Sequence, residues 1–117
     1  MNHPLRKPFL HPEYLRGANL RYCLLTLLSD SVRPRTITEL RVDLERLGLN
    51  VGGSDPNKVI ADVLRYELGL GRVRRTGRGR YESGFRPNTT VRRHRARLRD
   101  LVAKSIENRK SEQDFSL

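Results

Sequence analysis

The sequence predicts a mainly α-helical domain with a small β-hairpin, followed by a basic C-terminal helix. Apolar residues recur at helical spacing in three segments between residues 12 and 68, which is typical of helices that each bury one face. A β-prone run with glycines near its centre follows over residues 72–82, as expected for two antiparallel strands and a tight turn. We therefore expect the order helix, short strand, helix, helix, hairpin.

The composition divides the chain into four parts. Its 117 residues, 36% of them apolar, suffice for one small core. We expect an extended basic arm at 1–12, a compact domain at 13–84, a linker and basic helix at 85–107, and a disordered tail at 108–117.

The first helix is expected over residues 12–29. Pro12 suits a first helical turn, and an apolar face follows it. Cys23 falls on that face, where a buried structural thiol is the commoner role. Because it is the one cysteine in the sequence, an intrachain disulfide is excluded, and a reducing compartment fits.

Recognisable capping residues begin the next two helices. Thr36 and Glu39 have the spacing of a capping box, and Gly48 suits the left-handed position that stops a helix. Asp55 is a good cap for the third helix, with Pro56 in its first turn.

One charged residue, Glu67, falls within the apolar stripe of the third helix. The stripe consists of Val59, Ile60, Val63, Leu64 and Leu68. Because an unpaired buried carboxylate is costly, Glu67 must reach the rim of the core or pair with an arginine.

Arginines are concentrated in residues 72–99, which hold eleven of them against one acid, Glu82. This quarter of the chain carries +10 of the total formal charge of +11. A solvated face or a genome that prefers arginine codons is the alternative explanation, but codon preference alone would spread arginine evenly. A one-sided basic cluster attracts polyanions, so nucleic acid is the first partner to expect.

The order of these elements resembles the winged helix-turn-helix family over about residues 14–84. The matching features are Asp55 and Pro56 at the start of the third helix, and a segment at 71–81 with glycines at its tip and an aromatic residue on its return strand. In that family the third helix usually enters the major groove, and the wing lies along an adjacent groove or the backbone. The resemblance therefore implies binding to double-stranded DNA.

The resemblance also implies where the DNA contacts lie. On the recognition helix, 54–68, the candidates are Asn57, Lys58, Asp62 and Arg65. On the wing, 72–82, they are Arg74, Arg75, Arg78 and Arg80, and the basic cluster adds Arg72 at the start of the same segment. Apart from the resemblance, Ser54, Asn57 and the first-turn amides of the helix can hold a phosphate, although Asp55 competes for these amides as a cap.

Asp62 has two interpretations. It can accept a hydrogen bond from cytosine, which would give sequence recognition. It can instead pair with Lys58 and Arg65 at i−4 and i+3, and such ion pairs are common on helix surfaces.

The hairpin arginines also have two interpretations. Gly77 and Gly79 allow the backbone to approach a sugar-phosphate strand, with Arg78 at the tip suited to a narrow minor groove. Alternatively, the arginines only shield an edge strand from aggregation. Tyr81 is expected to plug the core rather than to stack on a base.

The basic C-terminal helix has three candidate roles. Its apolar stripe, within residues 91–106, can pack on the first helix or on a second copy of the chain, and we favour the homodimer because narrow seams suit pairing. A dimer would present two related wings to a roughly palindromic operator. In the third role the helix lies on the phosphate backbone through Arg92, Arg93 and Arg97.

Catalytic constellations are missing from the sequence. The histidines are scattered, and one cysteine cannot supply a zinc site, so no enzyme activity, metal or cofactor is expected. His94 is a candidate for tuning a helix interface by pH. No apolar stretch approaches the roughly 18 to 20 residues of a membrane span, so no membrane association is expected.

These observations together predict a cytoplasmic protein of the bacterial nucleoid that binds double-stranded DNA, as a transcriptional regulator or a nucleoid-associated factor. No sensor domain follows the hairpin, so no small-molecule ligand is expected, and control is expected from abundance or a protein partner. The alternative is a protein-interaction module that docks an acidic partner within a larger nucleic-acid machine. RNA binding ranks third.

Overall fold

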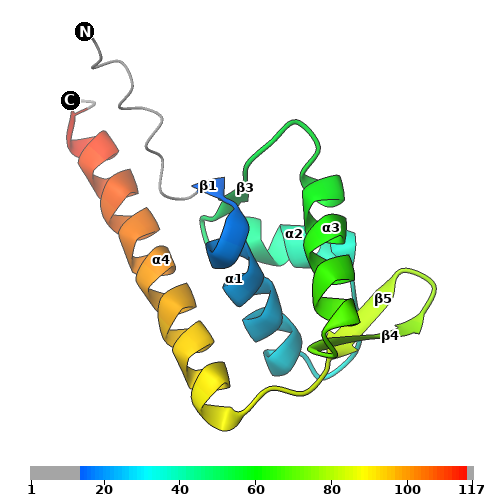
Figure 1. The fold of residues 1–117 in the computed structure, drawn as a ribbon. Helices are drawn as coiled ribbons and strands as arrows, with labels where there is room; N and C mark the ends of the chain where they lie inside the picture. The colour runs from blue at the N-terminus through cyan, green and yellow to red at the C-terminus, as the bar shows by residue number, and fades with distance from the viewer. Residues whose placement is uncertain (1–13, 116–117) are drawn as a thin grey trace, which may run out of the picture.

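Four helices and five short strands make up residues 14–115, the part of the chain that the computed structural model describes (Figure 1). The helices are α1 (Gly17–Asp30), α2 (Ile37–Arg46), α3 (Pro56–Gly69) and α4 (Asn88–Phe115). The strands are β1 (Tyr14–Leu15), β2 (Arg35–Thr36), β3 (Asn50–Val51), β4 (Val73–Gly77) and β5 (Arg80–Ser83). The expectation of a mainly helical domain with a small hairpin is confirmed.

Two small sheets join segments that are distant in sequence. β2, β5 and β4 form a three-stranded antiparallel sheet in that order, in which Arg35 lies opposite Tyr81 and Val73 opposite Ser83. β1 and β3 form a separate parallel pair. The hairpin expected over residues 72–82 is present, whereas the parallel pair was not predicted, because strands of two residues carry no periodic signal.

α1 lies at the centre of the fold and packs against the other three helices. Figure 1 shows α4, α1 and α3 in that order across the molecule, with the hairpin beyond the C-terminal end of α3. The core lies mainly among α1, α2 and α3. Its fully buried helical side chains include Leu20, Leu24, Leu25, Leu40, Leu44, Ile60 and Leu64.

The start of α1 differs from the prediction. The helix begins at Gly17 rather than at residue 12, because Tyr14 and Leu15 are extended and pair with β3. Leu15 is buried, and its carbonyl accepts a hydrogen bond from Gly52 N–H at 3.0 Å. Gly17 has a φ of +58°, which allows the chain to turn from strand into helix. The predicted arm and Pro12 fall in residues 1–13, outside the described part.

The caps of α2 and α3 are those that the sequence predicts. Glu39 N–H donates to Thr36 Oγ1 at 3.1 Å and Thr36 N–H donates to Glu39 Oε1 at 3.0 Å, which completes the capping box. Lys58 N–H donates to Asp55 Oδ1 at 3.2 Å. Gly48 has the expected left-handed backbone, with a φ of +83°. Local spacing therefore sets where both helices begin and how α2 ends.

α4 packs its apolar stripe on α1, so the first of the three predicted roles is the one the fold adopts. Leu101 is buried, and Leu98 and Val102 are partly buried against the core. The same stripe therefore does not offer the open seam that we favoured for a homodimer through residues 91–106. Ile106, at 47% exposure, is the part of the stripe that remains most open.

Residues 108–115, for which the sequence predicts a disordered tail, continue α4 in the structure. Their polar, charge-balanced composition is typical of disorder but equally of an exposed helix, and no glycine or proline interrupts them. Just before this segment, Ser105 Oγ donates to the carbonyl of Gly48 at 2.7 Å, which holds α4 against the end of α2. Although α4 is the longest helix, none of the helices in residues 14–115 is apolar enough at sufficient length to cross a membrane.

Candidate nucleic-acid interface

The β4–β5 hairpin is anchored at its base and exposed elsewhere. Val73 is buried, whereas every later residue of β4 is exposed. Arg75, Arg78 and Arg80 are all exposed, and none of the three forms an ion pair with residues 15–110, the part of the chain whose side chains are described. Gly79, at the tip, has a φ of +68°, a left-handed backbone conformation that residues with a side chain rarely adopt. The hairpin thus projects three cations into solvent.

Two other arginines of the predicted wing are already paired. Arg74 Nη2 lies 2.8 Å from Glu82 Oε2 across the hairpin. Arg72 Nε and Nη2 donate to the Glu67 carboxylate at 2.5 Å and 3.2 Å. Because Glu67 is fully buried, Arg72 neutralises a carboxylate within the core. The prediction that Glu67 pairs with an arginine is confirmed.

The outward face of α3 carries an ion-pair cluster. Lys58 Nζ and Arg65 Nη1 lie 3.3 Å and 3.2 Å from the two oxygens of Asp62. The ion-pairing interpretation of Asp62 is therefore the one that the structure adopts. Two cations share one acid, so this face has less free charge than the hairpin.

The N-terminal end of α3 is also occupied. Asn57 Oδ1 accepts a hydrogen bond from Arg41 Nε at 2.9 Å, so this amide is held by α2. Ser54 is exposed just before the cap residue Asp55, whose side chain accepts from the Lys58 amide. A phosphate at this terminus would compete with that cap.

α4 carries the remaining predicted contacts. Arg92 and Arg93 are exposed. Arg97 is also exposed, and its Nε donates to Asn19 Oδ1 on α1 at 3.0 Å. Arg95 instead pairs with Asp30 at 2.8 Å, at the end of α1.

Arg86 was counted in the basic cluster, yet it is buried at 6% exposure. Its guanidinium donates to the Leu25 carbonyl at 3.0 Å, to the Ser29 hydroxyl, and to His94 Nδ1 at 2.5 Å. Burial lowers the pKa of Arg86. No signal in the sequence distinguishes Arg86 from its exposed neighbours, because its partners lie far away along the chain.

The continuous arginine run of the sequence thus divides into two surfaces. The hairpin lies beyond α3, whereas α4 lies on the other side of α1 (Figure 1). The buried Arg86 separates the two in sequence. The hairpin surface and the α4 surface are therefore two distinct basic surfaces.

Cys23 lies in the core beneath these surfaces. It is buried, and desolvation raises the pKa of its thiol to about 12, although the charge of Arg97 opposes the rise. A thiol with this pKa holds its proton at neutral pH, which agrees with the predicted structural role.

No protein-family model, curated protein sequence or solved structure matches this chain. Its function is therefore inferred from the charges and the geometry of the chain itself.

Proposed function

We propose that the protein binds double-stranded DNA through its β4–β5 hairpin, as a winged-helix-like domain that has no catalytic role. The observation that carries this proposal is the group of three exposed arginines, Arg75, Arg78 and Arg80, which have no ion-pair partner among residues 15–110. Phosphate contacts by arginine release counterions, which makes such a group a strong attractor for a nucleic-acid backbone.

The hairpin shape suits a duplex. Two glycines near the tip, Gly77 and Gly79, leave room for close backbone approach, and a Cβ at either position would meet nothing within 4 Å. Arg78 lies between them, where it can enter a narrow minor groove whose negative potential attracts arginine. α3 then lies in the adjacent major groove, as in the family that the sequence resembles.

The Asp62 cluster on α3 favours a nucleoid-associated factor over a sequence-reading regulator. For Arg65 to hydrogen-bond a guanine, it must first leave Asp62, which lies 3.2 Å away. The hairpin arginines have no such competitor. We therefore expect affinity to come mainly from backbone contacts, with little sequence preference, on the bacterial nucleoid in the cytoplasm.

The test is fluorescence anisotropy with random and GC-rich duplexes over about 50 to 300 mM salt. Each phosphate contact contributes about 0.9 to the slope of log affinity against log salt, so Arg75→Ala/Arg78→Ala/Arg80→Ala should flatten the slope by about 2.7. Arg65→Ala should weaken binding to both duplexes equally.

The matched control is Arg99→Ala/Lys104→Ala/Lys110→Ala, which removes the same charge from exposed positions on α4. This variant should keep nearly the slope of the wild type. Equal losses in both triple variants would contradict a hairpin-led interface, and a preference for duplex RNA would contradict DNA as the ligand. An absence of duplex binding at the lowest salt would overturn the proposal and leave the hairpin as a surface for an acidic protein.

A further inference from the structure

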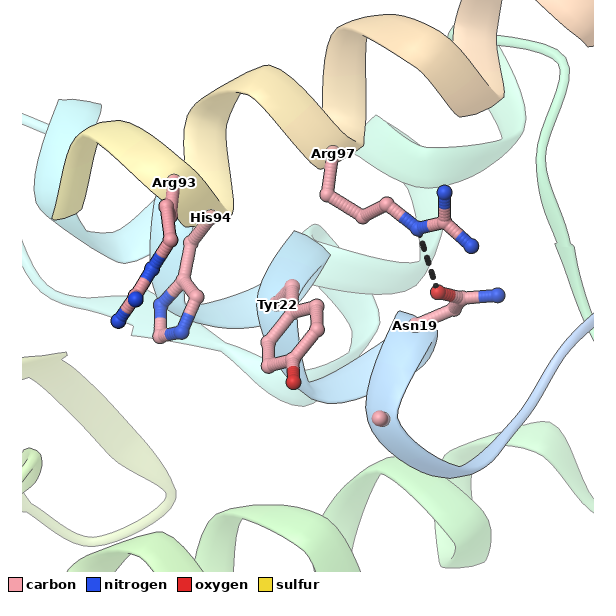
Figure 2. Close-up of a pocket in the computed structure, with 6 residues that line it drawn as sticks. Asn19, Tyr22, Arg93, His94 and Arg97 are labelled. Carbon is pink, nitrogen blue, oxygen red and sulfur yellow. Dashed lines mark hydrogen bonds between the residues drawn. The ribbon is translucent and has the colours of Figure 1, made fainter. Parts of the chain in front are cut away.

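A groove of about 690 Å³ lies between the N-terminal halves of α1 and α4 (Figure 2). It is lined by Ala18, Asn19, Tyr22, Arg93, His94 and Arg97. Figure 2 shows Arg93 and His94 at one end, Arg97 and Asn19 at the other, and Tyr22 between them. None of these six residues is acidic, so no carboxylate neutralises the two arginines from within the groove.

The polar groups of the groove are mainly hydrogen-bond donors. Arg97 Nε donates to Asn19 Oδ1 at 3.0 Å (Figure 2), which uses the amide oxygen and leaves the amide nitrogen to donate elsewhere. The remaining nitrogens of Arg97, and the guanidinium of Arg93, have no acid beside them in the groove. A ligand for this groove must therefore supply acceptors and negative charge.

His94 adds a donor with a defined tautomer. Arg86 Nη1 lies 2.5 Å from His94 Nδ1, and because a guanidinium can only donate, Nδ1 must be the acceptor. The proton of the neutral imidazole is then on Nε2, on a ring that lines the groove. The ring is held in place by stacking on Tyr22, with centroids 4.4 Å apart and planes at 15°.

The aromatic residues leave little room for a nucleobase. Tyr22 stacks on His94, and the guanidinium of Arg21 lies over the Tyr22 ring at 5.3 Å from its centroid. Tyr22 is therefore already covered, whereas stacking on a base requires an open ring face. The groove fits a phosphodiester, whose oxygens accept bidentate hydrogen bonds from arginine, better than it fits a free nucleotide.

The groove is separate from the hairpin surface. Arg93 and Arg97 project from α4, which lies across α1 from α3 and the hairpin (Figure 1). Arg92 is exposed next to Arg93 and extends the positive charge along α4 beyond the groove. A backbone that continues past one phosphate gains from this extension, whereas a free phosphate ion does not.

We propose that the groove between α1 and α4 binds a backbone phosphate of a second DNA duplex, so that one protein molecule bridges two duplexes. This inference rests on the proposed function, because the hairpin must hold the first duplex. Arg97 and the Asn19 amide donate to the oxygens of this phosphate at one end of the groove, and Arg93 and His94 Nε2–H donate to the same backbone at the other end.

The test is a capture assay in which one duplex is fixed to beads and a second, fluorescent duplex is free in solution. Wild-type protein should retain the fluorescent duplex on the beads. Arg93→Ala/Arg97→Ala should lower this capture by about tenfold, as expected for the loss of charge-assisted hydrogen bonds. The same variant should bind a single duplex in anisotropy nearly as well as the wild type does.

The matched control is Arg99→Ala/Lys110→Ala, which removes the same charge from exposed positions of α4 that do not line the groove. Capture should stay close to the wild-type value, and thermal unfolding should show that both variants are folded. The inference is overturned if the wild type captures no second duplex, if the groove variant captures as much as the wild type, or if the control loses as much as the groove variant. Failure of the proposed function would look different, because the affinity for a single duplex, measured by anisotropy, would then not depend on the hairpin arginines.

Discussion

Arg72 and Glu67 form a two-pronged ion pair at the base of the hairpin, with N–O distances of 2.5 Å and 3.2 Å. The carboxylate is fully buried, and Arg21 Nε lies 3.6 Å from its Oε2 atom. The hydrogen bonds that Arg72 donates to Glu67 raise the pKa of Arg72. Because Glu67 is in the last turns of α3 and Arg72 immediately precedes β4, the pair fastens the hairpin to the core.

Arg72→Ala should destabilise the protein by about 3 kcal/mol, because the buried Glu67 carboxylate would keep only Arg21, which lies farther away, as an ion-pair partner. Urea unfolding followed by circular dichroism measures the change. The matched control is Arg74→Ala, which removes the exposed pair with Glu82 across the hairpin. It should cost less than about 1 kcal/mol. Equal losses in the two variants would contradict a structural role for the Arg72 pair.

Gly84→Ala should also destabilise the hairpin base. A Cβ at Gly84 would lie 2.2 Å from the Gly71 carbonyl oxygen and 2.8 Å from the Arg72 carbonyl carbon, both of which are backbone atoms. The backbone must then move, at a cost of about 1 to 3 kcal/mol as for other overpacked sites. Gly69→Ala is the control, because a Cβ there meets nothing within 4 Å. If urea unfolding shows equal stability for the two variants, the close approach at Gly84 is not a constraint.

Features that depend on local spacing could be predicted from the sequence. The capping box of Thr36 and Glu39 joins residues three positions apart, and so does the cap that Asp55 provides. Helical periodicity likewise located three of the helices, and a β-prone run with glycines near its centre located the hairpin. The pairing that the sequence required for Glu67 was also correct, because the cost of a lone buried carboxylate is general.

Features that depend on distant partners could not be predicted. α1 begins late because β1 pairs with β3, and neither strand is long enough to show a pattern. Arg86 is buried because α1 supplies its acceptors, the Leu25 carbonyl and the Ser29 hydroxyl. The division of the arginine run into two surfaces follows from the packing of α4 on α1, which the apolar stripe permitted but did not require.

Cys23 should resist thiol reagents in the native protein. It is fully buried, and a pKa raised to about 12 leaves almost no thiolate at pH 8. We expect the reaction with an aromatic disulfide reagent to be slow in buffer and complete in denaturant, as followed by absorbance. Unfolded protein is the control for reagent quality, and rapid labelling of the native protein would show that the α1 core opens easily.

His94 should make stability depend on pH below about 6.5. Burial lowers its pKa from the ordinary value of 6.5, and nearby cations lower it further, in the order Arg86, Arg21, Arg93 and Arg72. Because the folded pKa is below the unfolded pKa, the unfolded state binds more protons in this range, and stability rises with pH. The contribution of His94 to stability is therefore complete above pH 6.5 and is lost as the pH falls through the pKa of the folded state.

Glu39, whose pKa is lowered to about 2 by Arg33, titrates in a separate, more acidic range. In His94→Asn the side-chain oxygen can still accept from Arg86 without titrating, so the difference in urea midpoint between wild type and variant should change between pH 7.5 and pH 5. A constant difference would show that His94 does not titrate against the arginines around it.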